Sequence, residues 1–103
     1  MNRKALISVH KTPAAEFCEL DAGFELRYLA DYSKEPVSLV LPIRELKYDF
    51  AKFPSFLDGL LPEGIMLELL LKKNKLDAED YFSQILAVGN DLVGALTIVE
   101  ITE

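Results

Sequence analysis

Residues 54–64 read Pro-Ser-Phe-Leu-Asp-Gly-Leu-Leu-Pro-Glu-Gly, and the hydrophobic pattern of the chain changes at this stretch. Before it, apolar and polar residues alternate with a period of two, as in strands; from Phe53 the period moves towards 3.6, as in helices. Pro62 fixes its own φ and biases Leu61 away from helical geometry, and Gly64 tolerates backbone angles that other residues avoid. The stretch therefore predicts a stiff, protruding corner between two short helices.

Strand patterns fill most of the chain before this corner. The clearest is the run in which Phe24, Leu26 and Tyr28 alternate with Glu25 and Arg27, which is typical of a half-buried strand. Turn-forming residues separate this run from its neighbours. We expect strands at 5–10, 15–19, 24–30, 37–41 and 92–101, with Pro42 ending the fourth.

Helical patterns occupy the stretch from Phe53 to Gly89. Asp77 is the expected N-cap of the third helix, Asp80 lies at capping-box distance from it, and Gly89 is expected to end that helix. The expected helices are 53–60, 65–73 and 77–88. Residues 1–103 thus predict a single domain of the α+β class, with about five mostly antiparallel strands and three short helices packed on one side.

Composition and charge limit the kinds of partner. The chain has 103 residues, of which 50% are hydrophobic and 27% charged, so a folded core is expected in place of disorder. Residues 1–51 carry 7 basic and 8 acidic side chains, and residues 52–103 carry 4 and 9. An acidic second half argues against direct nucleic-acid binding, which needs clustered basic residues. It suits either a basic partner surface or simple solubility.

The residue sets that catalysis or metal binding needs are absent from the sequence. His10 and Cys18 are the single histidine and cysteine, with no third soft ligand near them. Gly89 and Gly94 lead from a helix into a strand, the reverse of a phosphate-binding loop. We therefore expect no enzyme activity, no catalytic residues, no metal and no cofactor. A lone cysteine and the lack of any long apolar run predict a cytoplasmic protein that has no membrane contact.

The second helix is more apolar than a surface helix should be. Met66, Leu69, Leu70 and Lys73 form one stripe at the spacing for packing on a sheet, yet Ile65, Leu67 and Leu71 lie outside that stripe. Either the helix is enclosed within the fold or part of it is free to bind a partner. The following run of Lys72, Lys73 and Lys75 suits the negative end of a helix dipole.

Three sequence blocks, taken together, resemble a known family. The Phe-x-x-Phe-x-Asp-x-Leu-Leu-Pro-Glu pattern within 53–64 is preceded by Val-Ser-Leu-Val-Leu-Pro at 37–42 and followed by Val-Gly-Asn-Asp-Leu-Val-Gly-Ala-Leu-Thr at 88–97. Their order and spacing are similar to the N-terminal subdomain of the HipA toxin-kinase family, over nearly the whole chain. HipA kinases continue for several hundred residues, whereas this sequence stops at Glu103.

A separate copy of this subdomain is similar to HipS of the three-part HipB, HipS and HipT toxin–antitoxin systems. The resemblance implies a non-enzymatic antitoxin that binds and inhibits a HipT-like serine/threonine kinase, and it leaves open whether a HipB-like DNA-binding protein joins the complex. In such proteins a large side chain after the Leu-Pro-Glu-Gly corner is pushed towards the kinase active site, and that position is Ile65 here. The implied partner-binding residues are Leu61, Pro62, Glu63, Gly64, Ile65, Met66, Leu67 and Leu71. The alternative is a structural subunit that completes a HipA-type kinase complex without blocking its active site.

Overall fold

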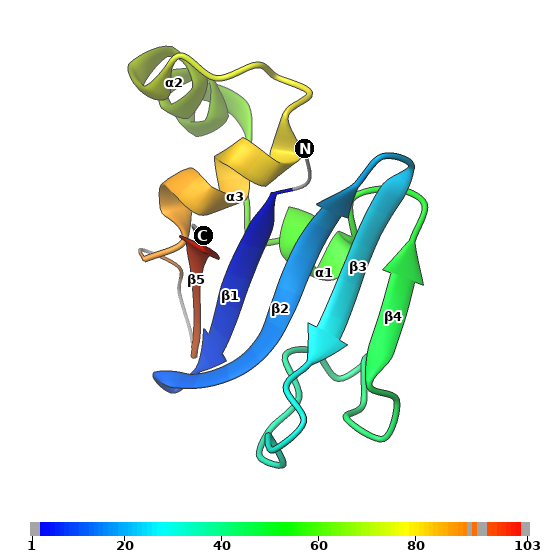
Figure 1. Ribbon diagram of the computed structural model, residues 1–103. Helices are drawn as coiled ribbons and strands as arrows, with labels where there is room; N and C mark the ends of the chain where they lie inside the picture. Colours follow the sequence, from blue (N-terminus) through cyan, green and yellow to red (C-terminus); the bar gives the residue numbers. More distant parts are fainter. Residues whose placement is uncertain (1–2, 91, 93–94, 102–103) are drawn as a thin grey trace.

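The strands of the computed structural model form one antiparallel sheet in the order β4-β3-β2-β1-β5. The structure describes residues 3–90, 92 and 95–101. The helices α1 and α3 lie against one face of this sheet, and α2 lies beyond its upper end (Figure 1). The elements, in chain order, are β1 (Lys4–Val9), β2 (Thr12–Leu20), β3 (Gly23–Tyr28), β4 (Lys47–Phe50), α1 (Ser55–Asp58), α2 (Gly64–Asn74), α3 (Tyr81–Val88) and β5 (Leu96–Ile101). The predicted α+β class with five antiparallel strands and three helices is confirmed.

The core lies between the sheet and the helices α1 and α3, and aromatic rings form its centre. Phe17 of β2 stacks on Phe24 of β3 and on Phe82 of α3, with ring centroids 5.5 and 5.7 Å apart. Phe53 meets the Phe17 ring edge-on at 5.9 Å. Aromatic pairs in these offset and edge-on arrangements add to the free energy gained by burying their area. This packing holds α3 and the segment that leads into α1 on the sheet.

The fourth predicted strand, at 37–41, is wrong. Val37 and Leu41 are buried, but Leu39 is 95% exposed and the backbone between them turns, with the Leu41 N–H donating to the Ser38 carbonyl oxygen. The alternation of apolar residues in this stretch reflects two anchors on either side of a turn. It does not reflect one face of a strand.

Tyrosine hydroxyls hold this loop in place of sheet hydrogen bonds. The buried Tyr28 hydroxyl donates to the Leu41 carbonyl oxygen at 2.6 Å and accepts from the Val37 N–H at 3.0 Å. The strand that pairs with β3 is β4 instead, a short element in which Tyr48 and Phe50 alternate with charged residues. Charged side chains on a short edge strand protect it from pairing with other chains.

The third helix begins four residues later than predicted, at Tyr81, and its N-cap is Asp80. The Asp80 carboxylate accepts a hydrogen bond from the Ser83 N–H at 3.1 Å. Asp77 caps a separate turn, in which its carboxylate accepts from the Glu79 N–H. Both aspartates thus bind backbone N–H groups, as their type favours, but the chain reverses between them before the helix starts. The end of the helix at Gly89 agrees with the prediction.

Helix α2 differs from the other two helices because it has no buried residue. It packs on α3, and Figure 1 shows it standing clear of the sheet. None of the helices in the described part of the chain is long and apolar enough to cross a membrane.

Candidate partner-binding site

The corner between α1 and α2 is built from a short helix, a turn and two residues, Glu63 and Gly64, whose backbone angles redirect the chain. After α1 the N–H of Leu60 donates to the Leu57 carbonyl oxygen and that of Leu61 to the Asp58 carbonyl oxygen, which tightens the chain into a turn. Glu63 is extended, and Gly64 has φ of 59°, a conformation that strains any residue with a Cβ. Apart from its chain neighbours and the backbone of its own helix, nothing lies within 4 Å of the position that a Cβ on Gly64 would take, so the corner projects into solvent.

The structure divides the predicted partner-binding residues into three groups. Ile65 is 70% and Met66 62% exposed, at the first turn of α2, and Glu63 and Gly64 beside them are also exposed. Leu61 is buried and anchors the corner on the core. The remaining members, Pro62, Leu67 and Leu71, are half-buried.

The stripe predicted to pack on the sheet lies elsewhere. Of the stripe, Met66 and Leu69 are exposed and only Leu70 is half-buried. The residues predicted to lie outside it include Leu67 and Leu71, which are half-buried as well. A helix that is apolar nearly all round gives no sequence signal for its rotation, because every face satisfies the same pattern. The rotation is set by docking on α3.

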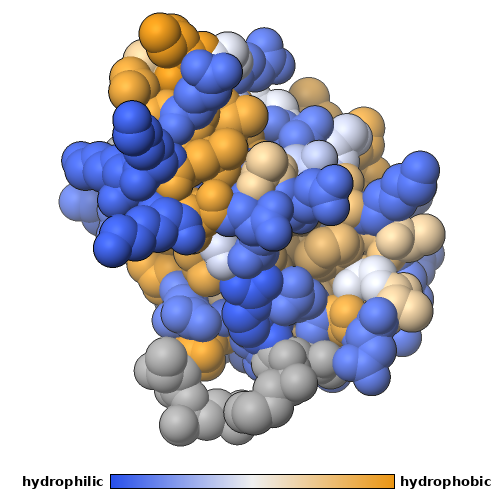
Figure 2. All heavy atoms as spheres, turned by 90° about the horizontal axis from the view of Figure 1, so that it is seen from above, coloured by the Kyte–Doolittle hydropathy of each residue, from blue (hydrophilic) through white to orange (hydrophobic). Residues whose placement is uncertain are grey.

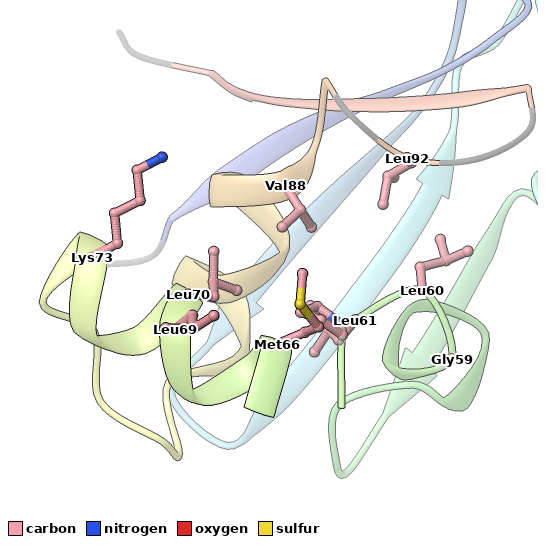
Figure 3. A pocket seen from close by; sticks show the side chains of 10 residues that line it. Gly59, Leu60, Leu61, Met66, Leu69, Leu70, Lys73, Val88 and Leu92 are labelled. Atoms are coloured by element: carbon pink, nitrogen blue, oxygen red, sulfur yellow. The ribbon is translucent and has the colours of Figure 1, made fainter. Parts of the chain in front are cut away.

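An apolar groove runs between α2, the corner and the end of α3 (Figure 3). Its volume is about 700 Å³. Seen from above, the hydrophobic surface around α2 is flanked by hydrophilic side chains (Figure 2). The described residues that line the groove are Gly59, Leu60, Leu61, Pro62, Met66, Leu69, Leu70, Lys73, Val88 and Leu92.

Sequence reasoning missed this groove as a site, although it named several of its residues. Leu60 follows α1 and Val88 ends α3, and only tertiary packing brings them into one groove with Leu70 of α2 (Figure 3). The signal available in the sequence was the excess of leucine in α2, which indicated unpartnered apolar surface without placing it. Lys73 is the one charged residue among the described lining residues.

The main charged cluster of the described chain lies elsewhere and is structural. Arg3 binds Glu19 and Asp80 through its guanidinium nitrogens, at 2.7 to 2.9 Å, and lies 4.9 Å from the centre of the Phe82 ring. Partial burial would raise the Asp80 pKa, but hydrogen bonds from Arg3 and Ser83 outweigh it and lower that pKa below its ordinary value. The cluster ties the start of the chain to β2 and α3. The described residues contain no group of three His, Cys, Asp or Glu side chains placed to hold a metal.

The family model described as HipA N-terminal domain matches residues 5–99. The chain belongs to this family. An uncharacterized protein from Haemophilus influenzae is 30% identical over 78 residues, which are 76% of this chain and 74% of that protein. The two sequences are therefore of similar length.

The solved structure of the N-terminal domain of HipA toxin has the same fold. It superposes with a TM-score of 0.79 at 23% sequence identity, covering 98% of this chain and 94% of that one. The family model confirms the family that the three sequence blocks resemble, and the solved structure confirms the fold. The family relationship associates the chain with toxin–antitoxin systems.

Proposed function

We propose that this protein is a cytoplasmic antitoxin that binds a HipT-like serine/threonine kinase and holds it inactive through the corner between α1 and α2. The observation that carries the proposal is the exposure of Ile65, 70% of whose surface faces solvent at the tip of a rigid corner. An exposed aliphatic side chain gains free energy when a partner covers it. Because Pro62 already fixes its own φ, docking costs less conformational entropy.

The chemistry of the corner suits a nucleotide-binding cleft. Ile65 offers an apolar side chain of the kind that fills a base-sized pocket, and the exposed Glu63 carboxylate next to it would meet a basic group that otherwise handles phosphate. The chain would then inhibit by occupying the cleft, without any catalytic step of its own. A HipB-like DNA-binding protein is compatible with this arrangement as a third component.

A kinase assay with the cognate toxin tests the proposal. Ile65→Asp should weaken inhibition at least about tenfold, because burying an unpaired carboxylate in an apolar pocket is costly. Leu39→Asp is the matched control, since Leu39 is also an exposed aliphatic residue but lies in the loop at the opposite end of the sheet from α2 (Figure 1). Equal inhibition by a folded Ile65→Asp variant and by wild type would rule out the corner as the inhibitory element.

The alternative, a structural subunit that leaves the active site free, gains support from the groove. A concave apolar surface that does not include Ile65 in its lining provides a binding area beyond the tip of the corner. Binding of an ATP analogue to the kinase distinguishes the two functions. An inhibitor that enters the cleft lowers the affinity of the analogue, whereas a structural subunit leaves it unchanged.

A further inference from the structure

The groove and the tip of the corner are two separate surfaces on α2. Met66, Leu69 and Leu70 face the groove, while Ile65 is not among its lining residues. Met66 and Leu69 remain 62% and 56% exposed, so the apolar surface continues from the groove onto its rim. A small molecule is usually enclosed on most of its surface, and this open shape with an apolar rim suits a larger partner.

The walls of the groove determine what kind of segment fits. On two sides they are the helices α2 and α3, whose backbone hydrogen bonds are made within each helix, so an extended peptide finds no strand edge to pair with. An incoming segment must satisfy its own backbone polar groups, and a helix does so. The 11 residues of α2 extend over about 16 Å, which matches about three turns of an incoming helix.

Charge determines the direction of that helix. Lys73 lies at the end of the groove formed by the last turn of α2 (Figure 3) and has no ion-pair partner within the described part of the chain. A carboxylate on the incoming helix would pair with it. Acidic residues are most favourable in the first turn of a helix, so this end of the groove would receive the N-terminus. The incoming helix would run antiparallel to α2, an arrangement that also opposes the two helix dipoles.

We propose that the groove receives an amphipathic helix of the kinase partner, antiparallel to α2, with apolar residues at i, i+3 or i+4, and i+7 on the groove and an acidic residue in its first turn against Lys73. The partner is the kinase of the proposed function, so this inference rests on that function. The groove then supplies affinity, and Ile65 at the tip of the corner supplies inhibition.

Binding and inhibition are measured separately with the purified chain and the cognate kinase. Lys73→Glu should raise the dissociation constant about tenfold at low salt and less at high salt, because an exposed ion pair is screened. Leu69→Asp should raise it further. Both variants should still inhibit fully at saturating concentration. Lys72→Glu is the matched control: Lys72 is exposed in the same turn but does not line the groove, so its dissociation constant should stay within about twofold of wild type.

Several outcomes would overturn the inference. Leu69→Asp and Lys73→Glu variants that bind as tightly as wild type would show that the groove is unoccupied, and equal losses in Lys72→Glu and Lys73→Glu would show that only the general charge matters. A chain that binds through the groove but does not inhibit would contradict the proposed inhibition and leave this inference standing. A chain that does not bind the kinase at all would contradict both.

A charge reversal on the kinase completes the test. Hydrogen exchange of the complex identifies the kinase helix that becomes protected, and replacing the acidic residue in its first turn by lysine should restore binding of Lys73→Glu. If the protected kinase segment is not helical, or if no acidic residue in it restores binding, the proposal is wrong.

Discussion

The Gly89 carbonyl oxygen accepts a hydrogen bond from the Ile98 N–H at 3.0 Å, which joins the end of α3 to the edge strand β5. The approach is so close that a Cβ on Gly89 would lie 1.8 Å from the Ile98 carbonyl oxygen. Because that oxygen belongs to the backbone of a strand paired with β1, it cannot move away without disturbing the sheet. Glycine is therefore required at this position for space, since its φ of −57° is open to any residue.

Gly89→Ala should lower the free energy of unfolding by at least about 2 kcal/mol, as overpacking against fixed atoms does. Gly59→Ala is the control. A Cβ there would meet the Ser55 carbonyl oxygen at 3.4 Å, an ordinary contact, and the loss of backbone freedom in the unfolded chain should leave stability unchanged or slightly increased. Urea unfolding of the two variants measures the difference. Equal stabilities would contradict the close packing of α3 on β5.

The turn at 37–41 predicts different losses of stability for substitutions at Leu39 and Leu41. Leu39→Ser should change the free energy of unfolding by no more than about 0.5 kcal/mol, because Leu39 is 95% exposed. Leu41→Ala should cost about 2 kcal/mol or more, because its side chain is 6% exposed within the core. Thermal or urea unfolding measures both. A strand would place the two leucines on the same face, so comparable losses would support the strand and contradict the turn.

The errors of the sequence prediction share a physical origin. The strands near 5–10, 15–19 and 24–30 were predicted from local alternation, and the structure has strands over most of each range. The segment 37–41 shows the same alternation, but the Tyr28 hydroxyl, thirteen residues before Leu41, satisfies its backbone groups and replaces a neighbouring strand. A hydrogen bond made through tertiary packing leaves no periodic trace in the sequence.

One part of the candidate site was predictable from local sequence and the other part was not. The corner was predictable because Pro62 and Gly64 act on their own backbone angles, and Gly64 does adopt positive φ. The groove was not, because it depends on how α2 is rotated on α3 and on the meeting of Leu60, Leu70 and Val88 from three separate segments. The start of α3 was misplaced for a related reason: Asp80 is held both by Ser83 within the helix and by Arg3 from the other end of the chain.

The ion pair between Arg3 and Asp80 predicts that the free energy of unfolding depends on pH. The Asp80 pKa is lowered in the folded state, so its contribution is present above the unfolded value, about 3.9, and is lost as the pH falls through the folded value. Asp80→Asn keeps an N-cap but removes the charge. The variant should be about 1 kcal/mol less stable than wild type at pH 7, and the difference should shrink below about pH 4. Urea unfolding at several pH values checks this. A constant difference would show that the charge is not responsible.

The thiol of Cys18 predicts slow chemical modification of the folded chain. Cys18 lies in β2 and is 9% exposed, and burial raises its pKa above the ordinary value, so little thiolate is present near pH 8. Iodoacetamide should therefore label the native protein at least about tenfold more slowly than the urea-unfolded chain, in which the thiol is exposed and its pKa is ordinary. Because Cys18 is the single cysteine, mass spectrometry follows one site without interference.

Destabilised variants such as Gly89→Ala should label faster than wild type, in proportion to the fraction of open molecules. Equal labelling of native and unfolded chains would contradict the burial of Cys18 within the sheet.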